Sequence, residues 1–357
     1  MRAWCCKCKR ENSSCSIPSI KIGGQNKYRA RLINQATTLI IIFLFSNTAF
    51  AGVGTESLQF LKIKPSARVA SLGDGFVGLA DDSNASSYNP AGLAALKTPE
   101  ISLMHLAYIG ETSYECVTGL VPAGKNLTLG GYVIYLNYGS INKTGEDGSG
   151  VYSGTNGAFN PYNLAGGVSA GYMLSKNLSV GVGLKYAAED IDGNSISGVM
   201  GDAGVLYTLE GTGIGASLNN IGSGSSPMMV RFGVSTKLSL MNDDDFIVAL
   251  GGNYVLASGK TVESIGVEYC YDSFISVRGS YGIGYDVNNV NIGAGVKQNL
   301  EGLLCGLDYN FSLFGDFGSA HRISLTVKFG DDFKTGKVRK KSSGYKAPKY
   351  QNKIRRF

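Results

Sequence analysis

The chain has 357 residues, of which 50 are glycine and 20 tyrosine, and its charged share of 17 % is low for a protein. The mean hydropathy of +0.02 suits membrane-crossing strands of alternating polarity, although a soluble β protein can have the same average. The net charge of +6 divides into +7 over residues 1–31, +8 over 330–357 and −9 between them. Two basic ends around an acidic body argue against a nucleic-acid-binding domain with a basic face.

The N-terminus has the layout of a secretory signal peptide. We divide it into an N-terminal extension with a basic region, 1–31, and a hydrophobic and cleavage region, 32–51. The apolar run Leu39–Phe45 precedes Ala49-Phe50-Ala51, a small-x-small cleavage pattern. Because the run is short for a membrane-spanning helix, we expect cleavage before Gly52, with an uncleaved anchor as the alternative.

Residues 52–99 do not alternate in polarity like the rest of the chain. Small and apolar residues occupy Ala67–Ala80 at mixed spacing, and the polar sequence ADDSNASSYNPAG follows at Ala80–Gly92. This pattern predicts a short helix that ends in a polar, proline-containing turn. Such a segment cannot join a barrel wall, so we expect it inside or below the barrel, as a plug.

From Glu100 onward, the chain repeats about ten residues of alternating polarity followed by a turn. Fourteen segments follow this pattern: 100–109, 112–121, 126–138, 161–175, 177–190, 196–209, 211–221, 228–239, 244–256, 261–271, 273–283, 289–299, 302–313 and 319–329. We therefore predict an all-β fold, a 14-stranded antiparallel transmembrane β-barrel over 100–329, with a short, partly helical N-terminal plug.

An even number of strands places both termini on the periplasmic side of a bacterial outer membrane. The longest link, Gly139–Asn160, then lies outside, and its richness in Gly, Ser, Thr and Asn predicts a mobile surface loop. Residues 330–357 form a basic tail that we expect in the periplasm.

The strand face opposite the aliphatic residues carries small residues and isolated charges, as expected of a narrow polar lumen. The candidates for lumen-facing charges are Lys185, Asp202, Glu268, Arg278, Lys297, Asp308 and Arg322. We favour mutual pairing that fills the interior over a substrate path lined by these charges.

No catalytic or metal-binding pattern stands out. The two histidines, His105 and His321, lack metal-ligand spacing and a neighbouring nucleophile. Asp81-Asp82-Ser83-Asn84 could bind a cation, but capping a helix or forming an Asx turn is the commoner use. The glycines of Gly211–Gly215 open a strand, which predicts close backbone packing rather than nucleotide binding. We expect no enzyme activity, no cofactor, no metal ion and no nucleic-acid partner.

An ordered set of motifs resembles one known family. The sequence FLKIKPSARVASLGDGFVGLADDSNASSYNPAGLAAL at Phe60–Leu96 is similar to the N-terminal signature of the PorV/PorQ family, itself similar to FadL-type barrels. Further similar stretches lie at Gly201–Tyr207, Leu218–Gly222 and Asn142–Thr144. The resemblance implies a 14-stranded outer-membrane barrel whose plug motif consists of Gly73, Asp82, Asn89, Pro90, Ala91 and Gly92.

The resemblance implies two possible functions, and the basic tail adds a third. PorV-like members accompany type IX secretion, so our main expectation is a barrel in outer-membrane lipid that supports protein secretion or surface assembly by docking cargo proteins or secretion-system components. The alternative is FadL-like passive transport of hydrophobic small molecules. A third possibility is a structural barrel that anchors the envelope through its basic tail. This chain departs from the family pattern in that tail, because a barrel usually ends at its terminal aromatic residue, here Phe329.

Overall fold

The computed structural model describes residues 56–222, 226–240, 244–287 and 289–330. The predicted signal peptide, its cleavage site and most of the basic tail lie outside the described residues.

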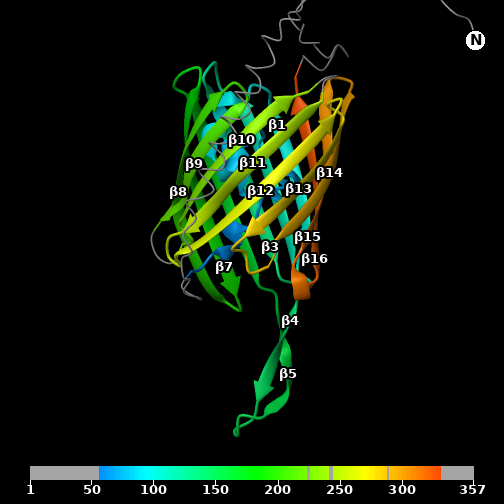
Figure 1. Ribbon diagram of the computed structural model, residues 1–357. Coiled ribbons are helices and arrows are strands. Elements are labelled where there is room, and N and C mark those ends of the chain that lie inside the picture. The colour runs from blue at the N-terminus through cyan, green and yellow to red at the C-terminus, as the bar shows by residue number, and fades with distance from the viewer. Residues whose placement is uncertain (1–55, 223–225, 241–243, 288, 331–357) are drawn as a thin grey trace, which may run out of the picture. The chain divides into compact units, whose positions relative to one another are not determined.

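Fourteen antiparallel strands close into a barrel, as predicted (Figure 1). Each strand pairs with the next barrel strand along the chain, β3 with β6 included, and β1 closes the barrel by pairing with β16. The strands are β1 (Glu100–Ala107), β2 (Ser113–Pro122), β3 (Leu127–Asn137), β6 (Tyr162–Met173), β7 (Leu178–Ile191), β8 (Asn194–Leu209), β9 (Thr212–Gly222), β10 (Met229–Ser239), β11 (Asp245–Val255), β12 (Lys260–Tyr271), β13 (Ile275–Ile283), β14 (Val290–Leu300), β15 (Leu303–Leu313) and β16 (Ser319–Phe329). All predicted boundaries lie within two residues of these.

The alternation of polarity in the sequence becomes the two faces of the wall. In β1, for example, Glu100, Ser102 and Met104 are buried, whereas Ile101 and Leu103 are exposed. An outward band of aliphatic residues and tyrosine around a polar interior is typical of a barrel that sits in lipid. None of the helices among the described residues is long and apolar enough to cross a membrane.

The segment before β1 folds inside the barrel as a chain of short helical turns rather than one helix. These are η1 (Gln59–Lys62), α2 (Ala67–Leu72), η2 (Gly73–Gly75), α3 (Phe76–Leu79), α4 (Ala85–Tyr88) and η3 (Pro90–Ala95). Ser66 caps α2 by accepting a hydrogen bond from the Val69 amide, and Asn89 caps η3 by accepting one from Ala91. We call residues 56–99 the plug.

Glycines on the inner face of the wall let the backbone of the plug lie directly against it. A Cβ atom added at Gly181 in β7 would lie 2.2 Å from the Pro90 carbonyl carbon. One added at Gly266 in β12 would lie 2.2 Å from the Leu72 carbonyl oxygen. The plug backbone comes similarly close at Gly171, Gly213, Gly215 and Gly251, whereas Gly204 and Gly293 lie against the side chains of Asn89 and Ser71. Close packing of plug and wall therefore accounts for part of the high glycine content.

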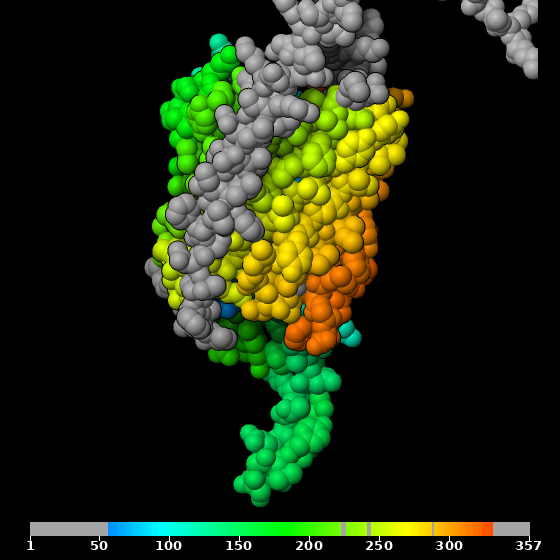
Figure 2. Space-filling view, in the orientation of Figure 1, coloured from blue at the N-terminus to red at the C-terminus, as the bar shows by residue number. Residues whose placement is uncertain are grey.

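The stretch Gly139–Asn160 is not the irregular loop that was expected, because it folds into a two-stranded hairpin of β4 (Ile141–Glu146) and β5 (Tyr152–Phe159). In Figure 2 the hairpin projects beyond the end of the barrel. The carboxylate of Asp147 accepts backbone hydrogen bonds within the turn, and these bonds lower its pKa. Both faces of the hairpin are largely exposed, so no apolar alternation marks it in the sequence.

Candidate functional site: a chamber above the plug

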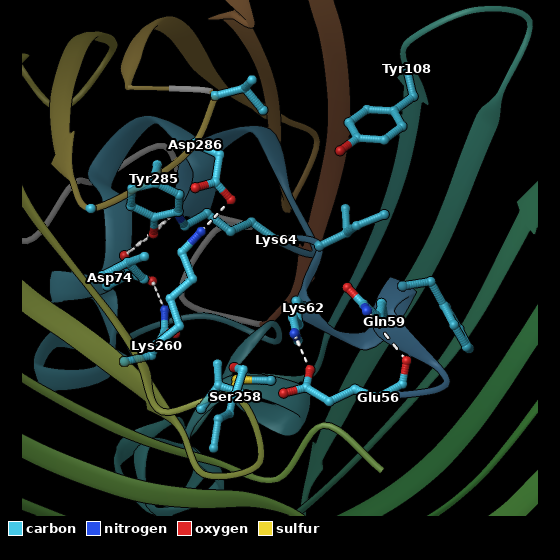
Figure 3. Close-up of a pocket in the computed structure, with 18 of the residues that line it drawn as sticks. Glu56, Gln59, Lys62, Lys64, Asp74, Tyr108, Ser258, Lys260, Tyr285 and Asp286 are labelled. Atoms are coloured by element: carbon cyan, nitrogen blue, oxygen red, sulfur yellow. Dashed lines mark hydrogen bonds and ion pairs between the residues drawn. The ribbon is translucent and has the colours of Figure 1, made fainter. Parts of the chain in front are cut away.

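A chamber of about 850 Å³ lies at the hairpin end, which we define as the barrel end from which β4 and β5 project. The links between barrel strands at that end surround it, including Tyr108, Ser258 and Tyr285. The first residues of the plug, from Glu56 to Lys64, enter the same space (Figure 3). The chamber is therefore bounded by the wall, the links and the plug.

Much of the lining is apolar or aromatic. It includes Phe60, Ile63, Tyr108, Leu136, Met229 and Phe314. The rings of Tyr108 and Phe314 meet edge to face with their centroids 5.4 Å apart. A mixed lining of this kind suits an organic molecule that carries a few polar groups.

The carboxylate of Asp74 organises the polar side of the chamber. It accepts hydrogen bonds from Tyr88 at 2.8 Å and Asn253 at 3.2 Å, and a further one from Tyr285 (Figure 3). Lys64 Nζ lies 3.7 Å from the same carboxylate. Burial alone would raise the pKa of Asp74, but Lys64 and the tyrosine hydroxyls hold it below the usual value. Asp74 is therefore an anion that ties the plug to the wall.

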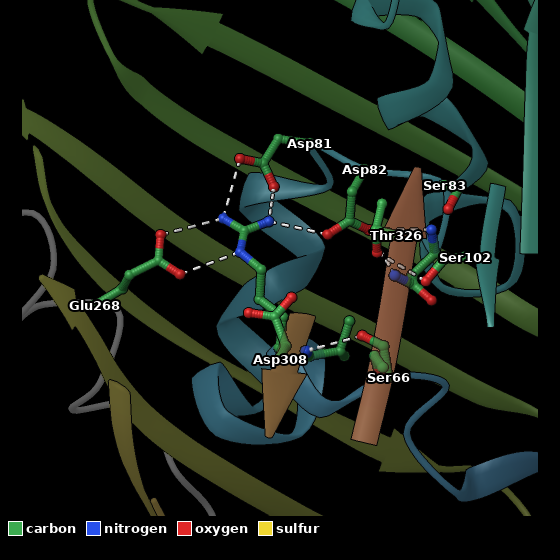
Figure 4. A network of polar contacts seen from close by, with 12 residues as sticks. Ser66, Asp81, Asp82, Ser83, Ser102, Glu268, Asp308 and Thr326 are labelled. Atoms are coloured by element: carbon green, nitrogen blue, oxygen red, sulfur yellow. Dashed lines mark hydrogen bonds and ion pairs between the residues drawn. The ribbon is translucent and has the colours of Figure 1, made fainter. Parts of the chain in front are cut away.

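A second polar cluster, which we call the latch, joins the other side of the plug to the wall. The guanidinium of Arg68 contacts Asp81 at 2.5 Å, Asp82 at 2.9 Å and Glu268 of β12 at 3.1 Å (Figure 4). Burial raises the pKa of Asp82, and its ion pair with Arg68 opposes this shift without reversing it. Asp82 also accepts a hydrogen bond from the Asn84 amide, so this acidic stretch forms the Asx turn that was the favoured alternative.

The predicted lumen-facing charges fall into separate groups. Lys185 pairs with Asp202 at 2.8 Å, and Arg278 pairs with Glu268 and, at 2.6 Å, with Asp308. Arg322 is buried and lines the chamber. Lys297, in contrast, is only half-buried near the other end of the barrel. Five of the seven predicted residues thus form ion pairs with one another, whereas Arg322 and Lys297 lie outside these pairs.

Residues of the plug motif shape its turns. Gly73 has a φ of 70°, and a Cβ atom there would lie 2.4 Å from Ser264 Oγ. Asn89 Nδ2 donates to the Val77 carbonyl at 2.9 Å, while Pro90 and Ala91 begin η3. Gly92 packs against the Ala80 carbonyl. The NPAG turn therefore holds two parts of the plug together.

The two wall motifs, Gly201–Tyr207 and Leu218–Gly222, lie on the paired strands β8 and β9. They meet at a register shift between Gly201 and Ala203. At this shift Asp202 of β8 lies opposite two residues of β9, Asn219 and Asn220, so the extra residue is in β9. Asp202 accepts hydrogen bonds from the Asn220 amide at 2.9 Å and from Asn219 Nδ2 at 3.4 Å. These motifs build a bulge in the wall.

Sequence reasoning missed several residues of the site, namely Lys64, Arg68, Asp74 and Arg231. Arg231 occupies an inward position of β10, so the alternation of that strand could have revealed it. The three plug residues lie where no periodic pattern predicts side-chain direction. Among the described residues, no group of three or more His, Cys, Asp or Glu side chains is placed to hold a metal ion.

A protein-family model described as an uncharacterised protein family (UPF0164) matches residues 46–205. A search of curated proteins gives no match. Among solved structures, the Pseudomonas putida toluene transporter TodX is similar, with a TM-score of 0.50 and 12 % identity over 79 % of this chain and 98 % of that one. The Ralstonia pickettii toluene transporter TbuX has a TM-score of 0.46 and 14 % identity over 69 % and 92 % of the two chains. A Pseudomonas aeruginosa FadL homologue has a TM-score of 0.44 and 9 % identity over 79 % and 99 %.

The TodX likeness shows that the chain has the FadL-like barrel fold. The shared architecture extends over almost the whole of that transporter. The resemblance to the PorV/PorQ family specifically stays a prediction.

Proposed function

We propose that this chain is an outer-membrane barrel that admits hydrophobic small molecules passively through the chamber, without catalysing a reaction. The observation that carries the proposal is the chamber itself, about 850 Å³ in volume, with aromatic and aliphatic walls and a floor formed by the plug. The outward apolar band supports a place in lipid, and the fold shared with a toluene transporter supports the class of cargo.

This proposal reverses the order of the sequence-based expectations, in which secretion came first. The plug contacts the wall along several strands and is tied to it by Asp74 and by the latch. A molecule that enters the chamber therefore reaches a floor of separate short turns rather than one rigid helix. We propose that passage requires local rearrangement of those turns.

The experiment uses cells that express the chain and a neutral, hydrophobic fluorescent probe that an intact outer membrane excludes. Uptake should be several-fold faster than in cells without the chain. Val262→Trp adds a large ring at a buried position in the chamber lining and should return uptake toward the background. Val199→Trp, on the outer face with 59 % exposure, is the matched control and should leave uptake unchanged. Equal uptake with and without the chain would contradict the proposal.

The projecting hairpin favours a second candidate, which is PorV/PorQ-like docking of exported proteins. Its strands pair only with each other among the described residues, and Ile141, Val151 and Tyr152 are exposed on it. If this function holds, deletion of residues 139–160 should lower the surface level of exported proteins in the native host and leave probe uptake unchanged. The envelope-anchoring function depends on the tail, which lies beyond the described residues.

A further inference from the structure

Two arginines in the chamber have no carboxylate partner. Arg231 of β10 and Arg322 of β16 are 4 % and 3 % exposed, and both line the chamber. Neither takes part in any of the ion pairs found in the described part of the chain, and the Nε atom of each is buried without a hydrogen-bond partner there. Burying an unpaired charge is costly, so two such groups facing one cavity point to a ligand.

The neutral contacts of these arginines orient them without compensating their charge. Arg231 lies over the Tyr88 ring with its guanidinium carbon 4.1 Å from the ring centroid. Arg322 Nη1 donates to Asn310 Oδ1 at 3.0 Å and to Ser312 Oγ at 2.7 Å. Both guanidinium groups are therefore held in place before any ligand arrives, which reduces the entropy lost on binding.

The charge of the whole lining is positive. Two lysines are matched, because Lys62 pairs with Glu56 and Lys260 with Asp286 (Figure 3). Lys64 shares Asp74 with its neighbours. Five basic side chains thus face three acidic ones, which leaves an excess of two positive charges.

The two unpaired arginines, Arg231 and Arg322, lie close to Lys64. Burial lowers the pKa of Lys64, Asp74 opposes this shift, and both arginines lower the pKa further. Lys64, Arg231 and Arg322 therefore act on one another across the same cavity. Two negative charges on a ligand would balance the excess, and guanidinium groups suit carboxylate and phosphate oxygens.

We propose that the chamber binds a small organic dianion whose negatively charged oxygens contact Arg231 and Arg322 and whose apolar part lies against Phe60, Tyr108 and Phe314. This inference rests on the proposed function only in that it assigns a ligand class to the same chamber. A neutral hydrocarbon fills the apolar part alone, whereas a dianion uses both parts.

The test is calorimetric titration of the purified full chain in non-ionic detergent at pH 7.5 and low salt. The probes are hexyl phosphate and hexylmalonate as two sources of the dianion, with heptanoate and 1-hexanol as the singly charged and neutral comparisons. We expect at least one dianion to bind at least tenfold more tightly than heptanoate. Which dianion binds better tells phosphate from dicarboxylate, and equal binding of heptanoate and both dianions would overturn the inference.

Variants separate recognition from folding. Arg231→Met and Arg322→Met should each weaken dianion binding by tenfold or more, whereas Lys237→Met, outside the chamber, should not. Because each arginine is an unpaired buried charge, its removal should leave the denaturation midpoint unchanged or higher. Unchanged dianion binding in both variants would contradict the assignment, as would loss of binding only in step with loss of folded protein.

The uptake assay distinguishes this inference from the proposed function. Persistent uptake of the neutral probe without dianion binding would overturn the anion site and leave the transport function standing. Dianion binding without uptake of the neutral probe would uphold the site and overturn the transport function.

Discussion

At the scale of single residues, the contact between plug and wall depends on the absence of side chains. Gly181 lies against the Pro90 carbonyl group, where backbone rather than a flexible side chain occupies the space. Gly181→Ala should therefore destabilise the folded barrel by about 1–3 kcal/mol, since overpacking forces backbone shifts. The measurement is the urea midpoint in detergent. Gly198→Ala is the control, because a Cβ atom there meets nothing within 4 Å; equal midpoints for both variants would contradict the packing argument.

The latch residue Arg68 makes a second prediction at this scale. Arg68→Met leaves Asp82 buried without its cation, whereas Glu268 keeps its pair with Arg278. Leaving one partner of a buried pair alone should cost about 3–5 kcal/mol. Lys237→Met breaks a pair with Asp245 in which the lysine side chain is 45 % exposed, so it should cost only about 0–1 kcal/mol. For both variants, the measurements are the urea concentration at the unfolding midpoint and the rate of protease cleavage within the plug. A plug that stays protected in Arg68→Met would show that the latch does not hold it.

The carboxylate of Asp74 makes the stability of the folded barrel depend on pH. Its pKa in the folded state is below the value of 3.8 expected for an unperturbed carboxyl. The stabilisation it provides is therefore complete above about pH 4 and is lost as the pH falls through the folded-state value. The stability difference between the native chain and Asp74→Asn should be constant from pH 7 to about pH 4 and shrink below. A difference that already shrinks between pH 7 and pH 5 would refute this.

At the scale of elements, the barrel and the hairpin are independent in their pairing. The hairpin's strands form their own sheet, and every barrel strand has both of its neighbours without them. Replacing residues 139–160 by a short turn should leave the denaturation midpoint of the barrel equal to that of the unaltered chain within experimental error. The reason is that β3 and β6 already pair along their lengths. Loss of the folded species in this deletion would show that the hairpin is part of the barrel's folding unit.

Sequence alone predicts the elements whose pattern is local. The fourteen wall strands were found because each shows its two faces within about ten residues. The hairpin was missed because neither of its faces is buried, as the exposed Val151 and Tyr152 show. The plug was recognised by its lack of alternation, but its division into short turns depends on contacts with the wall.

At the scale of the whole molecule, the candidate site is built by contacts between distant parts of the chain. Arg68 and Glu268 are 200 positions apart, and Asp74 and Asn253 are 179 apart. Seven inward charges could be named from their strands, yet the sequence did not say that Lys185 pairs with Asp202 while Arg322 faces a cavity. Those distinctions come from closure of the barrel around the plug.

The most direct test of the account is fractionation of cells that express the chain, followed by gel electrophoresis of the outer-membrane fraction with and without heating. A membrane-spanning barrel should appear in that fraction and migrate faster unheated than heated, because the closed sheet resists detergent until it is boiled. A single mobility, with the chain in the soluble periplasmic fraction, would contradict the membrane barrel and the transport function built on it.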